Sequence, residues 1–97
     1  MITSKQRKKL SGLGQKIDAI FQIGKNGLSD SLVNELSNAL EARELIKISV
    51  LNNSQLKAKE VIGELANALG AEPISCVGSK IVLYRKSTKD IKHIELD

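Results

Sequence analysis

Apolar positions near the start of the chain recur at the spacing of an amphipathic helix. Thr3, followed three residues later by a glutamine, forms a capping-box pattern that opens this helix. Leu10 and Leu13 fall on its apolar face. Because a glycine costs about 1 kcal/mol inside a helix, we expect the helix to end at Gly12 or Gly14.

Two further stretches carry apolar stripes of helical period. The first follows Ser29, a good N-cap residue, and ends near Arg43. The second follows a turn and N-cap at residues 52–54 and precedes Gly70, where we expect a left-handed C-cap. The stripes consist of Leu32, Val33, Leu36, Ala39 and Leu40 in the first stretch, and of Ala58, Val61, Ile62, Leu65, Ala66 and Leu69 in the second.

Four shorter runs have the length and composition of β-strands. Residues 19–23 are mostly apolar and predict a short, largely buried strand. Residues 45–51 alternate between apolar and polar side chains, which predicts one buried face and one face open to solvent. Residues 74–77 and 80–85 form the last two strands, which are separated by only two residues.

The last two strands predict a hairpin that turns at Gly78 and Ser79. Pro73 opens the first of them, where its missing N–H group is tolerated. Glycine in the first position of the link suits a type II′ turn. The resulting register pairs Cys76 with Ile81 and Ile74 with Leu83 on the core face, and places Ser75, Val77, Val82 and Tyr84 on the other.

The order of these elements predicts an α/β fold, with an N-terminal helix followed by β-α-β-α-β-β. Strands joined through helices should be parallel, and the hairpin adds an antiparallel strand, so we expect a four-stranded mixed sheet. With few helices available, a two-layer sandwich with helices on one face is the natural arrangement. The opposite, open face would then carry Lys47, Val82 and Tyr84.

The chain length supports one domain and a short extension. A chain of 97 residues fits a single domain, which we place at residues 1–86. Residues 87–97 are polar and predict a loose tail, in which residues 91–96 are a candidate short strand.

The charge of the chain is unevenly distributed. Its net charge is +4. Residues 1–27 hold six basic and one acidic side chain, residues 28–74 hold four and seven, and residues 75–97 hold five and three. The positive charge is therefore concentrated in the two ends of the chain. An anionic partner would explain this asymmetry, and so would a soluble protein with basic ends.

Three features predict a protein of the cytoplasm. No apolar run approaches the roughly 18 residues that a membrane span requires. The basic residues at the N-terminus are not followed by the apolar stretch of a secretory signal. The single cysteine, Cys76, cannot form a disulfide within the chain, which fits a reducing compartment.

A glycine-rich loop stands between the first strand and the second helix. It consists of Gly24, Lys25, Asn26 and Gly27. The glycines permit positive φ and close approach of a ligand to the backbone, and a helix N-terminus favours phosphate. A loop of this form clamps a nucleic-acid backbone in KH domains. Many ordinary strand-to-helix turns also carry two glycines, whereas the longer pattern of a mononucleotide P-loop is absent.

Three runs of sequence together resemble a known family. They are Ile-Gly-Lys-Asn-Gly-Leu-Ser at residues 23–29, Glu-Leu-Ile-Lys-Ile at residues 44–48, and Gly-Ser-Lys-Ile-Val-Leu-Tyr-Arg at residues 78–85. In order and spacing, across residues 3–86, the chain resembles the CRM (chloroplast RNA splicing and ribosome maturation) domain family, and most closely its free-standing bacterial YhbY type.

This resemblance implies a fold and a function. The implied fold is similar to the C-terminal domain of translation initiation factor three. The implied partner is RNA, bound through the loop of Gly24, Lys25, Asn26 and Gly27 and the basic surface beside it. Because the bacterial form is associated with precursors of the large ribosomal subunit, the resemblance implies a ribosome assembly factor that binds ribosomal RNA, and we expect a monomer.

Other side chains extend this candidate site. Lys5, Lys8 and Lys9 project together from the first helix, either as RNA contacts or as an ordinary solvated face. Tyr84 is a candidate for base stacking on the open sheet face, although packing is the favoured interpretation. Arg85 either contacts phosphate or pairs with Glu72 across the hairpin.

Nothing in the sequence predicts catalysis or a cofactor. Cys76 falls on the predicted core face and is expected to be inert. One cysteine and one histidine, His93, far apart in sequence, form neither a metal site nor a nucleophile with its base. A small nuclease is therefore disfavoured. The remaining alternatives are a generic KH-like binder of single-stranded RNA and a protein–protein adaptor that uses the acidic helices.

Overall fold

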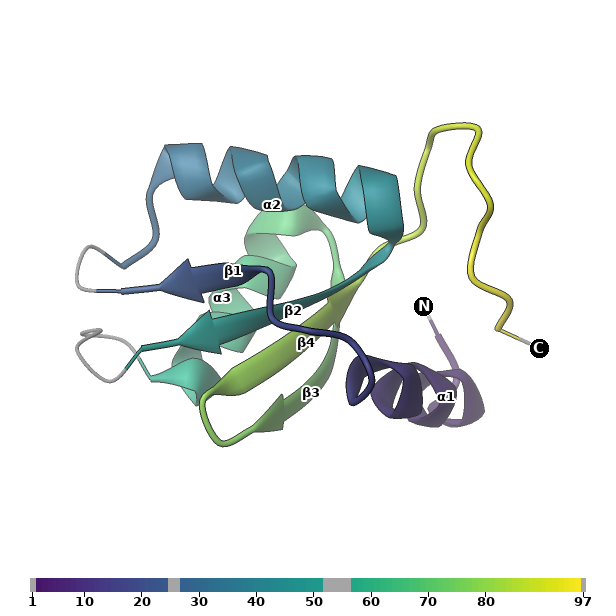
Figure 1. Ribbon diagram of the computed structural model, residues 1–97, viewed down its shortest axis with the longest axis horizontal. Helices are drawn as coiled ribbons and strands as arrows, with labels where there is room; N and C mark the ends of the chain where they lie inside the picture. Colours follow the sequence, from purple (N-terminus) through teal and green to yellow (C-terminus); the bar gives the residue numbers. More distant parts are fainter. Residues whose placement is uncertain (1, 25–26, 52–56, 97) are drawn as a thin grey trace.

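The computed structural model describes residues 2–24, 27–51 and 57–96 and confirms the expected α/β fold class. In chain order the elements are α1 (Ser4–Gly14), β1 (Phe21–Ile23), α2 (Asp30–Arg43), β2 (Leu45–Val50), α3 (Ala58–Leu69), β3 (Glu72–Val77) and β4 (Lys80–Tyr84). The strands form one mixed sheet in the order β1-β2-β4-β3 (Figure 1). β1 is parallel to β2, and β4 is antiparallel to both of its neighbours, β2 and β3.

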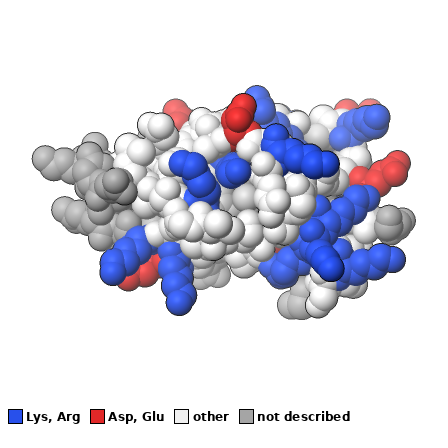
Figure 2. Space-filling model, turned by 60° about the horizontal axis from the view of Figure 1, so that its bottom comes forward, with Lys and Arg blue, Asp and Glu red and all other residues white. Residues whose placement is uncertain are grey.

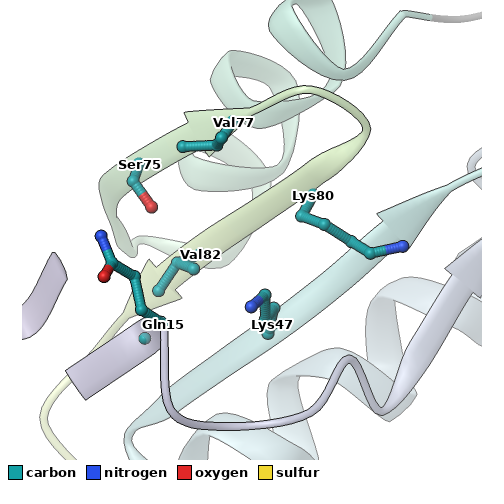
Figure 3. A pocket seen from close by; sticks show the side chains of 7 residues that line it. Gln15, Lys47, Ser75, Val77, Lys80 and Val82 are labelled. Atoms are coloured by element: carbon teal, nitrogen blue, oxygen red, sulfur yellow. The ribbon is translucent and has the colours of Figure 1, made fainter. Parts of the chain in front are cut away.

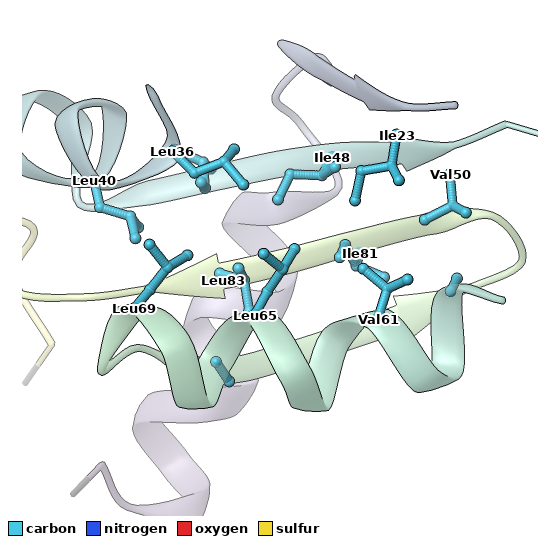
Figure 4. Packing of buried hydrophobic residues seen from close by; sticks show 13 residues of the cluster. Ile23, Leu36, Leu40, Ile48, Val50, Val61, Leu65, Leu69, Ile81 and Leu83 are labelled. Atoms are coloured by element: carbon cyan, nitrogen blue, oxygen red, sulfur yellow. The ribbon is translucent and has the colours of Figure 1, made fainter. Parts of the chain in front are cut away.

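The main core lies between the sheet and the helices α2 and α3. The apolar stripes of these helices meet the alternate side chains of the strands (Figure 4), so the expected layer of helices against one sheet face is confirmed for α2 and α3. The expectation that all helices lie on one face is wrong, because α1 packs on the other face. Each such leucine or isoleucine contributes about 1.5–3 kcal/mol relative to an exposed side chain. The fully or almost fully buried members are Ile23, Leu36, Leu40, Ile46, Ile48, Val61, Leu65, Ile81 and Leu83.

Three helix ends use the expected capping residues. Thr3 and Gln6 form a complete capping box at the start of α1, and α1 continues through Gly12 to Gly14. The Ser29 side chain accepts a hydrogen bond from the N–H of Leu32 at 3.1 Å and caps α2. Gly70 ends α3 in the left-handed conformation, with φ at 63°. The turn predicted at residues 52–54 lies outside the described residues. The N-cap expected there is wrong, because α3 begins at Ala58 with Lys57 at its N-cap and without a side-chain cap.

The expected bounds and burial of β1 are partly wrong. The strand begins at Phe21 rather than residue 19, and Ile20 is 39% exposed. The reason is that β1 is an edge strand, with a hydrogen-bonded neighbour on one side only. β2 ends at Val50, one residue earlier than expected, and Leu51 is exposed.

The β3–β4 hairpin has the expected turn but only part of the expected register. Gly78 has φ at 59°, as the first position of a type II′ turn requires. Cys76 lies opposite Ile81 as predicted, but a bulge next to Ile74 places Pro73 opposite Leu83. Cys76 is exposed rather than buried, because β3 is an edge strand.

α1 packs against the face of the sheet opposite α2 and α3. There a second apolar cluster is formed by Leu10, Leu45, Ile74, Val82 and Tyr84, with Ile2, Leu13, Ile17, Ile94 and Leu96 packed against it. Val82 and Tyr84 lie on this face as expected, but they are buried, so the face is not open at their positions. The packing interpretation of Tyr84 is therefore confirmed.

The C-terminal residues are fastened to the domain, and the expectation of a loose tail is wrong for residues 87–96. The buried carboxylate of Glu44 accepts hydrogen bonds from the N–H groups of Ser87 and Ile94, both at 2.7 Å. The Ser87 hydroxyl donates to the carbonyl of Glu41 at 2.6 Å. Residues 91–96 form no strand, because the backbone there pairs with a side chain and not with the sheet.

Within the described ranges, no helix combines the length and the apolar character that crossing a bilayer would require.

Candidate nucleic-acid interface

Three lysines form the exposed side of α1. Lys5, Lys8 and Lys9 follow one another at helical spacing and are all exposed, because Leu10 turns the opposite side of the helix toward the sheet. The sequence of α1 contains no acidic residue. Figure 2 shows lysine and arginine side chains gathered at the α1 end of this face of the molecule. This surface therefore presents uncompensated positive charge.

Arg7 differs from its lysine neighbours. Its guanidinium lies 3.6 Å from the carboxylate of Glu72 and donates to the backbone carbonyl of Pro73. These contacts tie α1 to β3, and they engage Glu72, the partner expected for Arg85. Arg7 thus has a structural role in docking α1 onto the sheet.

The sheet itself adds two lysines to the same side of the molecule. Lys47 on β2 lies opposite Val82 on β4, and Ser49 lies opposite Lys80, so all four side chains belong to the face that α1 covers in part. The Lys80 ammonium group donates to the Ser49 hydroxyl at 2.8 Å. Beyond the end of α1, Lys47, Lys80 and Val82 border a shallow hollow of about 230 Å³ (Figure 3).

A second hollow, of about 520 Å³, lies beside the first and shares Lys47 with it. Lys16 and Arg43 also line it, together with one acidic residue, Asp18. The positive charge of α1 therefore extends across the sheet through side chains from the α1–β1 connection, α2 and β2.

The glycine loop closes tightly after β1. The N–H of Gly27 donates to the carbonyl of Gly24 at 3.0 Å, and Gly27 has φ at 65°. A residue with a side chain is strained at that φ, which explains glycine at this position. Lys25 and Asn26, the two central residues of the predicted loop site, lie outside the described residues.

The structure does not bring the glycine loop and the α1 lysines together. α1 packs where β2 begins, at Leu45, whereas Gly24 follows Ile23, which pairs with Val50 at the other end of β2. Five steps along a strand at about 3.3 Å each separate the two ends by roughly 16 Å. Figure 1 shows α1 and the end of β1 at opposite ends of the sheet.

Sequence reasoning alone misses two of the lysines beside these hollows. It places Lys47 on the correct sheet face but does not single out Lys80 or Lys16. The alternation of the strands contains the signal for Lys47 and Lys80, because both stand at outward positions of strands that pair with each other. The alternation does not show how much of this sheet face α1 leaves uncovered.

Arg85 is engaged inside the protein. Its guanidinium donates to the carbonyl of Leu69 at 2.8 Å, and to the carbonyl and hydroxyl of Ser37 at 3.0 and 3.1 Å. It also lies 3.5 Å from the carboxylate of Glu41, so the alternative in which Arg85 pairs with Glu72 is wrong. These bonds join β4 to α2 and α3. A phosphate contact by Arg85 stays an untested prediction, and its geometry favours a structural role.

Carboxylates near the tail have altered acidity. The side-chain hydrogen bond from Thr88, with help from Arg85, lowers the pKa of Glu41 below 4.5. His93 lies 2.6 Å from the carboxylate of Glu44 through its Nδ1 atom.

Within the described ranges, there is no group of three or more His, Cys, Asp or Glu side chains that could hold a metal ion.

Comparison with known proteins gives consistent results. Residues 2–85 match the CRS1 / YhbY (CRM) domain. The chain is 40% identical over 96 residues to "Probable RNA-binding protein YqeI" of Bacillus subtilis, covering 99% of each chain. It is 30% identical over 86 residues to "RNA-binding protein" of Haemophilus influenzae, covering 89% of this chain and 87% of that one.

A solved structure agrees with these matches. The solution structure of the hypothetical protein SAV1595 from Staphylococcus aureus, described as a candidate RNA binding protein, superposes with a TM-score of 0.74. The two chains are 40% identical, and the superposition covers 100% of each.

Proposed function

The chain belongs to the CRS1 / YhbY (CRM) domain family, and from that premise we propose that it is a non-enzymatic RNA-binding protein. Both relatives described above and the superposed structure carry names that refer to RNA binding. We further propose that the RNA is ribosomal, in precursors of the large subunit, and that the protein acts there as a monomeric assembly factor in the cytoplasm.

The observation that carries the proposal is the unpaired basic surface of α1. Lys5, Lys8 and Lys9 stand on one exposed side of a helix without an acidic residue. Lysine is a point charge on a flexible stem, which suits it to phosphate oxygens more than to fixed contacts with base edges. The surface therefore supplies affinity for an RNA backbone of varied sequence.

The first test removes this charge. In the triple variant K5A/K8A/K9A, affinity for two unrelated RNAs should fall by similar factors. The slope of log affinity against log salt should become shallower by roughly 0.7 for each phosphate of a single strand that is no longer neutralised. The variant K5R/K8R/K9R keeps the charge and is the matched control, whose slope should equal that of the native protein. An unchanged slope in the alanine variant would place these lysines outside the interface.

The glycine loop is proposed as a second contact with the RNA backbone. Gly24 and Gly27 bring the chain into a tight turn that a nucleic-acid backbone can approach closely, and Lys25 adds charge. Replacing Gly24 with a bulky residue should block this approach.

The loop test must separate binding from folding. Asparagine tolerates positive φ better than most residues, so Gly27→Asn is a gentler change than Gly27→Val. We expect both variants to lose RNA affinity, and only the valine variant to lose several degrees in its thermal melt. Native affinity in a folded Gly24→Leu, Gly27→Asn double variant would remove the loop from the site.

The proposed role in ribosome assembly has its own test. In a sucrose gradient of a cell extract, the protein should sediment with precursors of the large subunit rather than with translating ribosomes. K5A/K8A/K9A should shift toward the fractions of free protein. Recovery of the native protein only in those free fractions at low salt would contradict the assembly role.

A further inference from the structure

Part of the sheet face opposite α2 and α3 is left open beyond the end of α1. α1 ends at Gly14, and a Cβ atom there would lie 3.0 Å from both methyl groups of Val82, so the helix sits directly against β4 at this point. Beyond it, the next side chains outward on β2 and β4 are Lys47, Ser49 and Lys80. The two lysines stand over a hollow that no element of the described chain fills (Figure 3).

The charge in this hollow is positive and unopposed. Its lining residues are Gly14, Gln15, Lys47, Ser75, Val77, Lys80 and Val82, with no carboxylate among them. Lys47 faces Val82 and Lys80 faces Ser49, so the two lysines are diagonal neighbours on adjacent strands. Diagonal positions lie about 7–8 Å apart at the backbone, and the flexible stems of two lysines at that spacing allow both ammonium groups to reach the same phosphate.

The rest of the hollow suits a sugar and a base. Val82 is buried and forms an apolar floor, while Val77 is 71% exposed and forms a wall. The hydroxyl of Ser75 and the amide of Gln15 supply donors and acceptors at the rim. At about 230 Å³ the hollow is smaller than the roughly 300–1,000 Å³ of pockets that enclose a whole ligand. That size fits one unit of a longer chain.

We infer that this hollow is a subsite for one nucleotide of single-stranded RNA. A phosphate lies between Lys47 and Lys80, the apolar faces of the nucleotide rest on Val82 and Val77, and the ribose 2′-hydroxyl bonds with Ser75 or Gln15. The inference rests on the proposed function and deepens it.

The position of the subsite links the two contacts proposed above. It lies between α1, which packs at the Leu45 end of β2, and Gly24, which follows β1 at the Val50 end. Gln22 pairs with Ser49, so the same row of the sheet continues onto β1, the strand that leads into the glycine loop. One RNA strand that crosses the sheet can therefore contact the α1 lysines, the hollow and the loop in succession.

Val77 allows a test that spares the fold. Its side chain is largely exposed on an edge strand, opposite Lys80. Val77→Glu places a carboxylate beside the proposed phosphate, Val77→Lys places a cation there, and Val77→Thr is the neutral control. With a short oligouridylate as the probe, we expect Val77→Glu to bind about ten-fold more weakly than Val77→Thr, because the carboxylate repels the phosphate. Val77→Lys should bind at least as tightly as Val77→Thr.

The lysines are tested at their own positions. K47Q/K80Q should make the salt slope shallower by roughly 0.7 for each phosphate that the two lysines neutralise, whereas K47R/K80R should keep the native slope. In a nuclear magnetic resonance titration with the same oligouridylate, the amides of Ser75, Lys80 and Gly14 should shift. An oligodeoxyuridylate should bind more weakly, because it lacks the 2′-hydroxyl.

The outcomes distinguish failure of the subsite from failure of the proposed function. If the native protein shows no salt-dependent binding to any RNA, the proposed function fails. If the native protein binds RNA but Val77→Glu matches Val77→Thr and K47Q/K80Q matches the native protein, the subsite is overturned and the α1 surface stands. Displacement of the oligouridylate by polyglutamate at equal charge would also overturn it, in favour of an acidic protein partner.

Discussion

Glu44 is the residue that attaches the C-terminal extension to the rest of the domain. It follows the last turn of α2 with φ at 68°, and its side chain is fully buried. Its carboxylate accepts bonds from the N–H groups of Ser87 and Ile94 and lies 2.6 Å from Nδ1 of His93. Ile94 then packs against the apolar cluster beneath α1. Losing the carboxylate should therefore release the extension and weaken that cluster.

Two substitutions separate the carboxylate from the backbone conformation. A hydrogen bond to a charged group contributes about 1.5–3 kcal/mol to the free energy of unfolding. The three bonds at Glu44 are not additive, because the groups of a released extension form hydrogen bonds with water instead. We expect Glu44→Ala to lower the free energy of unfolding by about 3 kcal/mol. A side chain at positive φ costs about 1 kcal/mol that glycine avoids, so Glu44→Gly should cost only about 2 kcal/mol.

The pH dependence of stability is an independent test of these contacts, because its direction follows from the pKa of Glu44. Burial alone raises the pKa of Glu44, but the hydrogen bonds from His93 and from the N–H groups of Ser87 and Ile94 outweigh it, so the pKa falls below 4.5. The folded chain therefore holds this proton less tightly than the unfolded chain. The ionised carboxylate stabilises the fold above pH 4.5, and this contribution is lost as pH falls through the lowered pKa.

The assay is urea unfolding and thermal melting of the native protein, Glu44→Ala, Glu44→Gly and Glu44→Gln. One kcal/mol corresponds to about 4–8 °C for a domain of this size, so the glycine variant should melt that much above the alanine variant. The stability difference between the native protein and Glu44→Gln should shrink as pH falls below 4.5. A difference independent of pH, or an alanine variant as stable as the native protein, would refute this account of the extension.

The remaining predictions concern the core and its supports. The chain has one tyrosine and no tryptophan, so an ultraviolet titration reports Tyr84 alone. Burial, and then the charge of Glu44, raise its pKa above 10, so its midpoint should lie above pH 10 and move down in Glu44→Gln. Arg85→Ala should destabilise the fold by about 3 kcal/mol. At a temperature well below its melting temperature, its RNA affinity should stay within two-fold of that of the native protein. Gly14→Ala should cost about 1–3 kcal/mol in urea unfolding, because its Cβ would meet Val82 at 3.0 Å, and Val82→Ala in the same chain should recover part of that loss.

The sequence alone determined those elements whose conformation depends only on residues close by in the chain. The capping box at Thr3, the cap at Ser29 and the left-handed end at Gly70 are all local, and all three were predicted. The same is true of the turn at Gly78, whose positive φ follows from the link length. The apolar stripes of α2 and α3 determined which sides meet the sheet, because helical period and strand alternation act over a few residues. The family followed from three runs of sequence in order.

Only the tertiary structure decided what lies far apart in sequence and close in space. The bulge beside Ile74 moves that side chain to the α1 face, and a one-residue slip of this kind leaves no mark in an apolar run. Arg85 bonds to α2 and to the last residue of α3, and Glu44 bonds to the extension. The partners of a charged side chain are those that the packing brings within reach, and the local sequence does not contain them. For the same reason the open part of the sheet, with Lys47 and Lys80, depends on where α1 ends against Val82.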